Sequence, residues 1–351
     1  MSVPKTMRAW RVHQYGEPLD VLQLEQVDTP EPGPGQLLVQ AEGIPLNLND
    51  LERINGGNMM VRPEFPYAPG MEAMGKVVAA GEGAESWLGK RVAAVADGAH
   101  GGFAEFVKCP ALSAFEVPQD LPMPDAAALF FPFHLAWLGL YDRARLQAGE
   151  TVLIHAAAGG SGSAAIQLAK YVGATVIASA GSEEKLKFCR ELGADYAVNY
   201  KEADFCELAL QLTDGKGVDV VFDNVGEAVM EKSMNALAYN GRYAMMGFAS
   251  NKSVADEAFL VPRKLALGNF SMLGVMLSYM DDSMITGLKS AMGWNFPPRS
   301  LGEQIQSSLM KLYRNGAIKA VVGKAISFEE IPQAIAEMAA SKTVGRVVAV
   351  L

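Results

Sequence analysis

The chain has 351 residues, of which half are apolar and 20% are charged, and its formal net charge is −9. This length suits two domains that each bury a core of their own. An acidic surface repels nucleic-acid backbones, so we expect no nucleic-acid partner. The longest apolar run, residues 126–141, is interrupted by Pro132 and His134 and is too short to cross a bilayer, and residues 1–8 lack the apolar core of a signal peptide. These features predict a cytoplasmic protein with no membrane partner.

Three cysteines, Cys109, Cys189 and Cys206, are widely spaced and form no C-x-x-C pair. Such a scattered, odd-numbered set predicts reduced thiols rather than disulfides, and it excludes a structural four-cysteine zinc site. We expect Cys189 and Cys206 on helices, and Cys109 at the end of a strand and partly exposed.

Residues 8–116 consist of short alternating apolar runs separated by Gly and Pro, a pattern typical of a compact, mostly β domain. After residue 125, strands alternate with amphipathic helices, which predicts an α/β fold with a doubly wound parallel sheet. The expected strands of this sheet are residues 152–156, 175–179, 196–199, 218–223, 241–246 and 271–275. The tail has expected helices at 301–315 and 331–341 and expected strands at 321–327 and 344–350, which need not belong to the parallel sheet.

A turn of small residues follows the strand expected at 152–156 and opens a helix. Small residues let the backbone approach a pyrophosphate closely, and the free N–H groups at the start of the helix attract its negative charge. Ala157 occupies the first glycine position of the G-x-G-x-x-G pattern, but the strand-turn-helix context still predicts a dinucleotide site. The expected pyrophosphate contacts are Ala158, Gly159, Gly160, Ser161 and Gly162.

The end of the next strand, about 20 residues further on, distinguishes NADH from NADPH. Enzymes that use NAD usually place an acidic residue there, whereas this chain reads Gly181-Ser182. With no carboxylate to repel a 2′-phosphate, and with Ser182, Lys185 and Tyr200 available to bind it, NADPH is favoured. The alternative for Lys185 is a solvated helix face. Further cofactor contacts are expected at later strand ends, from Asn224, Gly247 and Phe248.

Several motifs, taken together and in this order, resemble the medium-chain dehydrogenase/reductase superfamily. They are Gly70-Met71-Glu72, residues 98–105, 155–165 and 192–195, Phe222-Asp223-Asn224-Val225-Gly226, and residues 344–348. The chain is similar to the zinc-free quinone oxidoreductase branch related to zeta-crystallin. Asn47 and Met71 stand where zinc-dependent members carry a Cys and a His, so the resemblance implies no catalytic zinc.

The resemblance also implies the domain organisation and the assembly. A GroES-like, mostly β catalytic domain comprises residues 1–130 and 280–351, and a Rossmann NADPH-binding domain of residues 131–279 is inserted in it. A homodimer or homotetramer is implied, with Rossmann sheets joined edge to edge near residues 270–277.

Three residues are the catalytic candidates. Asn47 and Asp50 match a segment of the family's catalytic domain, and Asn47 is expected to hydrogen bond to nicotinamide or to a substrate oxygen. Asp50 either shares this role or caps the following helix. Tyr67 is a candidate proton donor, or else a packing residue. Where the family often has a Leu-Thr-Ala-Trp segment whose Thr lies beside nicotinamide, this chain reads His134-Leu135-Ala136-Trp137 and lacks that hydroxyl.

We therefore expect metal-independent hydride transfer from NADPH to quinones or α,β-unsaturated carbonyl compounds, with a small electrophilic molecule as the partner. Two alternatives stay open. One is 2-enoyl thioester reduction, which is less favoured because residues 54–58 lack the donor Tyr of mitochondrial-type enoyl reductases. The other is an NADPH-binding redox sensor with little turnover.

Overall fold

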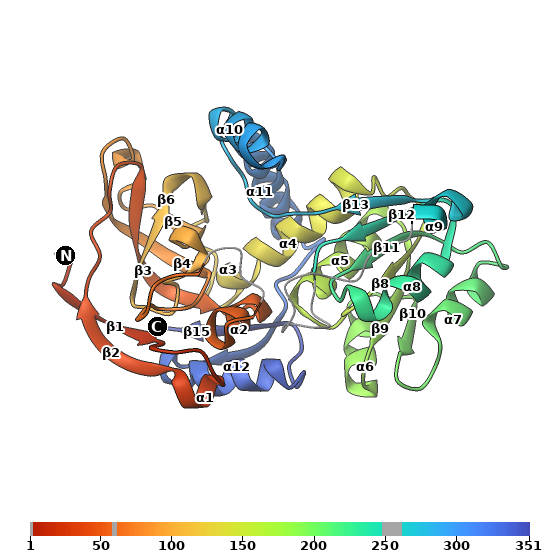
Figure 1. Ribbon diagram of the computed structural model, residues 1–351, viewed down its shortest axis with the longest axis horizontal. Coiled ribbons are helices and arrows are strands. Elements are labelled where there is room, and N and C mark those ends of the chain that lie inside the picture. The colour runs from red at the N-terminus through yellow and green to blue at the C-terminus, as the bar shows by residue number, and fades with distance from the viewer. Residues whose placement is uncertain (1–2, 58–61, 248–261) are drawn as a thin grey trace. The chain divides into compact units, whose positions relative to one another are not determined.

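The computed structural model describes residues 3–57, 62–247 and 262–351, which divide into two compact units (Figure 1). The terminal unit contains residues 1–130, 278–304 and 322–351, and the central unit contains residues 131–277 and 305–321. The expected boundaries place residues 305–321 in the catalytic domain, whereas the structure places them in the central unit. The reason is that Gln306 hydrogen bonds to His134 (3.0 Å), and the backbone N–H of Lys319 donates to Oε1 of Gln167 (2.8 Å).

A parallel sheet forms the middle of the central unit, with the strand order β10-β9-β8-β11-β12-β13. Its strands are β8 (Thr151–Ile154), β9 (Thr175–Ala180), β10 (Tyr196–Asn199), β11 (Val218–Asp223), β12 (Leu237–Met245) and β13 (Ser271–Gly274). Strands β8 and β11 are buried along almost their whole length, as is usual for apolar strands covered on both faces. The predicted α/β fold with a doubly wound parallel sheet is confirmed.

Helices connect these strands and surround the sheet (Figure 1). They are α4 (Phe130–Trp137), the π-helical η4 (Leu138–Arg143), α5 (Gly160–Val172), α6 (Glu183–Glu191), α7 (Phe205–Leu212), α8 (Glu227–Asn235) and α9 (Pro262–Gly268). The strand order reverses between β8 and β11, because the strands that follow β8 extend to one side and those that follow β11 extend to the other. Sheets of this kind bind ligands at the carboxyl ends of the strands beside such a reversal.

The terminal unit contains a mixed sheet with the strand order β14-β15-β3-β4-β5-β7, and β6 also pairs with β3. A separate pair, β1 and β2, is antiparallel. The strands are β1 (Thr6–Arg11), β2 (Gln23–Asp28), β3 (Gln36–Pro45), β4 (Glu72–Ala80), β5 (Arg91–Val95), β6 (Phe106–Pro110), β7 (Ala114–Glu116), β14 (Val322–Ile326) and β15 (Arg346–Val350). The two tail strands therefore belong to the β domain and not to the parallel sheet.

Short helices fill the connections of the terminal unit. They are α1 (Pro18–Val21), α2 (Leu48–Asn55), η1 (Glu85–Trp87), η2 (Asp97–Ala99), η3 (Ala111–Ser113), α3 (Asp125–Ala128), α10 (Asp282–Met292), η5 (Phe328–Glu330) and α12 (Ile331–Ala339). Helix α11 (Arg299–Arg314) begins in the terminal unit and ends in the central unit. Helix α12 packs against α1 and α2, so the two ends of the chain share one core.

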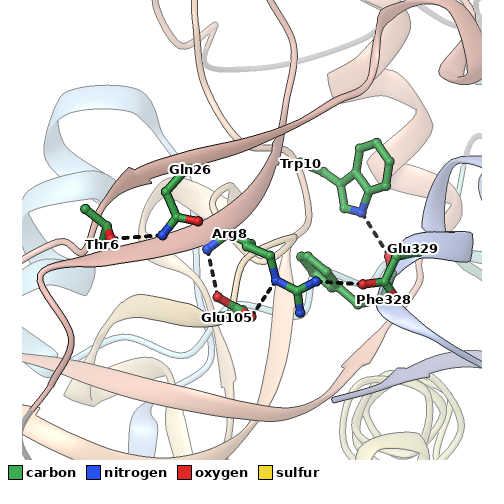
Figure 2. Close-up of polar contacts among 7 residues, drawn as sticks. All are labelled: Thr6, Arg8, Trp10, Gln26, Glu105, Phe328 and Glu329. Atoms are coloured by element: carbon green, nitrogen blue, oxygen red, sulfur yellow. Dashed lines mark hydrogen bonds and ion pairs between the residues drawn. The ribbon is translucent and has the colours of Figure 1, made fainter.

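Polar contacts also join the two chain ends within the terminal unit (Figure 2). Arg8 in β1 binds Glu105 (2.8 Å) and Glu329 (2.7 Å), and the Trp10 indole N–H donates to the backbone oxygen of Phe328 (2.9 Å). The last strand, β15, pairs antiparallel with β3. The terminal unit is thus assembled from segments more than 300 residues apart in sequence.

The expected exposure of Cys109 is wrong. Its side chain is fully buried in β6, in a core cluster with Leu37 and Val39, and burial raises the pKa of its thiol to about 12. The alternating pattern of β6 directs this position into the core. Cys189 and Cys206 lie on α6 and α7, as predicted. Within the described residues, no helix is both long enough and apolar enough to span a bilayer.

Candidate functional site

The turn after β8 leads directly into helix α5, which begins at Gly160. The turn is held by two backbone bonds, from Ala157 to the oxygen of Ser179 (3.1 Å) and from Gly159 to the oxygen of Ala156 (3.0 Å). A Cβ atom on Gly162 would lie 2.4 Å from the Ala156 oxygen, so only glycine lets the helix pack this closely on the turn. The first N–H groups of a helix have no intrahelical acceptors, and here they belong to the predicted segment 158–162.

The loop after β11, the neighbour of β8, contains a buried amide with an unused donor. Nδ2 of Asn224 is buried and has no hydrogen-bond partner among the residues that the structure describes. The loop is held by the Asp223 carboxylate, which accepts bonds from the N–H groups of Val225 (2.7 Å) and Gly226 (3.1 Å). Gly247 lies against this loop, because a Cβ there would be 2.5 Å from the Asn224 oxygen. Asn224 and Gly247 are therefore close together, and the predicted contact Phe248 lies outside the described residues.

A basic cluster lies at the end of β9, where α6 begins. Ser182 is the N-cap of α6 and accepts a long bond from the Lys185 N–H (3.4 Å). A Cβ on Gly181 would lie 2.7 Å from the Tyr200 hydroxyl and 3.3 Å from Cε of Lys201. Burial, and next the charge of Lys201, lower the pKa of Lys185. The structure thus brings Ser182, Lys185 and Tyr200 together, as predicted, and adds Lys201. Lys201 was not selected from the sequence, although it directly follows the predicted contact Tyr200.

These features fit a nicotinamide dinucleotide. The close glycine turn follows β8 and the unpartnered Asn224 amide follows β11, the two strands between which the sheet order reverses. The basic cluster follows the next strand, β9, where the adenosine ribose of a dinucleotide is bound in folds of this type. In this unit, the pyrophosphate contacts would be residues 158–162, and the 2′-phosphate contacts would be Ser182, Lys185, Tyr200 and Lys201.

A second polar cluster is buried in the terminal unit at the start of α2. The Asn47 N–H donates to Oδ2 of Asp50 (2.8 Å), and the Met71 N–H donates to Oδ1 of Asp50 (2.9 Å). Burial raises the pKa of Asp50 to about 7, against the opposing effects of Arg53 and of these two N–H groups. Asp50 therefore caps the helix, which is the structural alternative that the sequence left open.

The side chain of Asn47 is joined to two residues that sequence reasoning did not select. Oδ1 of Asn47 accepts a bond from Nη1 of Arg346 (2.7 Å), and Nη2 of Arg346 pairs with Oε1 of Glu72 (2.8 Å). Burial raises the pKa of Glu72, and Arg346 and Asn47 oppose this effect. Glu72 and Arg346 each lie in a motif of the family resemblance. The sequence therefore marked both residues as part of the family pattern, but it did not predict that they contact each other.

Tyr67 is buried, and its hydroxyl donates to the backbone oxygen of Arg53. Its ring stacks on Phe65 with a centroid separation of 5.5 Å. Burial raises the pKa of Tyr67. These contacts favour the packing role, and the role of proton donor stays a prediction.

Two further histidines are buried in the central unit. Burial lowers the pKa of His155 to about 3, so this ring is neutral, and Nε2 lies 2.8 Å from the Ser233 hydroxyl. His134 pairs with Gln306. Across residues 3–57, 62–247 and 262–351, no group of three or more His, Cys, Asp and Glu side chains is arranged to hold a metal ion.

Comparison with known proteins matches both units. The family model for the alcohol dehydrogenase GroES-like domain matches residues 33–119, and the model for zinc-binding dehydrogenases matches residues 160–290. A 2-haloacrylate reductase of a Burkholderia species is 35% identical over 71% of this chain and 75% of its own length. The quinone oxidoreductase of Rattus norvegicus is 32% identical over 78% of this chain and 81% of its own length.

A mycobacterial protein solved in complex with NADPH superimposes with a TM-score of 0.82 at 29% identity, and the match covers 98% of this chain and 100% of that one. The fold, the glycine turn and these relatives agree with one another. The chain is an NAD(P)-dependent oxidoreductase, and it belongs to the quinone oxidoreductase-like branch of the medium-chain dehydrogenase/reductase superfamily.

Proposed function

We propose that the protein reduces quinones or α,β-unsaturated carbonyl compounds with NADPH and without a metal ion. The observation that carries the choice of NADPH is the basic cluster of Lys185 and Lys201 beside Ser182 and Tyr200. Two ammonium groups at one strand end favour a 2′-phosphate over a 2′-hydroxyl. The NADPH complex of the mycobacterial structural relative supports the same choice.

The substrate class is supported by the relatives and by the cluster around Asn47. The relatives include a quinone oxidoreductase and a 2-haloacrylate reductase, whose names specify a quinone and an α,β-unsaturated acid. In this chain, Asn47 is bonded to Arg346 at the place where zinc-dependent members carry a metal-ligating Cys. An amide hydrogen bond there stabilises negative charge on a substrate oxygen without a Lewis acid.

In this mechanism, bound NADPH supplies the hydride. The chain's own residues bind and orient: the turn at residues 158–162 holds the pyrophosphate, and Asn47 donates to the substrate oxygen as its charge increases. We assign the proton to solvent water, because the Tyr67 hydroxyl is already bonded to Arg53. Asp50 keeps the helix start that carries Asn47 in place.

The test is the oxidation of NADPH, with NADH as the control cofactor, in buffer that contains a metal chelator. The acceptors are 1,4-benzoquinone, 9,10-phenanthrenequinone, a medium-chain 2-alkenal and 2-chloroacrylate. We expect turnover that prefers NADPH and is unchanged by the chelator. Activity that disappears on chelation contradicts the metal-independent mechanism, and equal use of NADH contradicts the assignment of the basic cluster.

Two other outcomes identify the alternatives. The same panel includes a 2-enoyl thioester. If this compound is reduced faster than every quinone and enone, the protein is an enoyl thioester reductase. Tight NADPH binding without turnover of any acceptor would indicate the redox-sensing role.

A further inference from the structure

Glu72 and Arg346 form a charged pair that the proposed mechanism has not yet used. Their side chains are only 2% and 7% exposed, and they lie at the first residues of β4 and β15. Removing two charges from water costs several kcal/mol per ion, so a buried pair is weak evidence for stabilisation alone. The pair makes a third contact, to the side chain of Asn47, and this contact suggests a role in the site.

The contact determines which way the Asn47 amide faces. A guanidinium can only donate hydrogen bonds, so the Asn47 atom 2.7 Å from Nη1 of Arg346 must be the carbonyl oxygen Oδ1. The NH2 group therefore faces away from Nη1. It donates to the backbone oxygen of Pro45 at 3.4 Å, a long bond, and its hydrogen bond to the Glu72 carboxylate lowers the pKa of Glu72 against the effect of burial.

We propose that Arg346 and Glu72 are positioning residues for Asn47: Arg346 binds its carbonyl oxygen, Glu72 accepts from one N–H of its NH2 group, and the other N–H exchanges its long bond to Pro45 for a substrate oxygen. This inference rests on the proposed function, because it takes Asn47 as the group that touches substrate. Glu72 holds Arg346 in place at 2.8 Å. A charge-assisted bond to the carbonyl end of an amide also polarises it and strengthens its N–H groups as donors.

The orientation matters for the charge that develops during the reaction. When hydride adds to the β carbon of an enone, the electron pair of the C=C bond moves towards the carbonyl, and the oxygen becomes negative. A proton from water then adds to the α carbon and completes the reduction. An amide held with its NH2 group towards this oxygen stabilises it, whereas the reversed amide would place its own oxygen there and repel it.

The experiment is a double-mutant cycle of Arg346→Met and Asn47→Ala, measured as kcat and KM. Asn47→Ala should lower kcat about 100- to 1,000-fold, as is usual for the loss of one oxyanion donor, and Arg346→Met should lower it by less because the Asn47 amide itself remains. The double variant should be no slower than Asn47→Ala, because Arg346 acts through Asn47. If Arg346→Met lowers kcat by the same factor in both backgrounds, the proposal is overturned.

Arg91→Met is the matched control. Arg91 is 7% exposed, pairs with Glu42 (2.7 Å) in the same unit and donates to the backbone oxygens of Pro118 and Leu121, so its loss should also destabilise this unit but leave kcat within about twofold. An equal loss of kcat in Arg91→Met would make the effect of Arg346 merely structural. If Arg346→Met does not fold, Arg346→Lys and Glu72→Gln replace it. Arg346→Lys can keep one bond to Asn47, and Glu72→Gln can keep one bond to Arg346, so we expect values of kcat between those of the wild type and of Asn47→Ala.

A second measurement does not depend on turnover. In protein labelled with ¹⁵N-asparagine, the side-chain NH2 signal of Asn47 is identified by its absence from Asn47→Ala. We expect this signal to shift or broaden in Arg346→Met and to stay unchanged in Arg91→Met; an unchanged signal in Arg346→Met overturns the positioning role. A wild-type protein that reduces no acceptor would overturn the proposed function alone, since the NMR comparison would still decide the positioning.

Discussion

Lys201 is a single side chain on which the proposed choice of cofactor depends. Its ammonium group lowers the pKa of Lys185, which places the two charges close together beside Gly181. Because like charges repel, a bound 2′-phosphate would relieve the repulsion as well as bind both groups. The proposed preference for NADPH is thus expected to depend on both Lys185 and Lys201.

Lys201→Ala should weaken NADPH binding about tenfold, which is roughly 1.4 kcal/mol, and leave NADH binding unchanged. Fluorescence titration of both cofactors measures this difference. The control is Lys187→Ala on α6, the helix that contains Lys185, because the Lys187 side chain is 75% exposed and lies near Glu191. Parallel losses of NADPH and NADH affinity in Lys201→Ala would contradict a phosphate contact.

His155 makes stability depend on pH. Its pKa falls from an ordinary 6.5 to about 3 in the folded protein because the ring is buried, so only the unfolded chain takes up a proton between these values. The free energy of unfolding therefore falls as pH drops below 6.5, by up to about 1.4 kcal/mol per pH unit. Asp50 has the opposite effect on the pH dependence of the free energy of unfolding. Its pKa is raised to about 7 in the folded protein, so its contribution to stability is lost as the pH rises towards 7.

His155→Gln isolates the first effect, because the amide can keep a bond to Ser233 but does not titrate. Urea unfolding at about pH 7 and about pH 5 should show that the variant loses less stability on acidification than the wild type. Identical pH dependence in the two proteins would mean that the pKa of His155 is the same in the folded and the unfolded chain.

At the scale of elements, β8 and α5 are closely packed at the turn that joins them. A Cβ on Gly162 would overlap the backbone of Ala156 and Ala157, whereas a Cβ on Gly159 would be 3.3 Å from the Ala156 oxygen. Gly162→Ala should therefore lower the free energy of unfolding by about 1–3 kcal/mol and weaken NADPH binding. Gly159→Ala should have a smaller effect on stability. Equal losses in both variants, measured by urea unfolding, would show that the overlap is relieved by a shift of the helix.

The sequence predicted the elements better than their contacts. The strands of the parallel sheet were visible as apolar runs, because burial on both faces leaves a local pattern. The sequence did not predict that β12 begins at Leu237. The first part of this strand pairs with β11 before a register shift, and that shift depends on the neighbouring strand. The bond between Asn47 and Arg346 was not predictable either, since the two residues are 299 positions apart. The burial of Cys109 likewise depends on a sheet that only the fold creates.

At the scale of the whole molecule, the terminal unit depends on its last strand. β15 lies between β14 and β3, and its residues Val347, Val348 and Ala349 are fully buried. Removal of residues 346–351 should therefore unfold the terminal unit, while the central unit, which contains none of these residues, keeps its cofactor site. Hydrogen exchange and NADPH titration of the truncated chain test this. Loss of NADPH binding together with the terminal sheet would show that the two units unfold as one.

The pairing of β15 with β3 also determines the order of events during synthesis on the ribosome. The strands of the central unit are all translated by Gly274, whereas β15, which completes the terminal sheet, begins only at Arg346. The N-terminal 130 residues must therefore wait, with an open strand edge, until β15 has been translated. A chain that stops before Arg346 would contain every strand of its cofactor-binding unit and would expose an aggregation-prone edge.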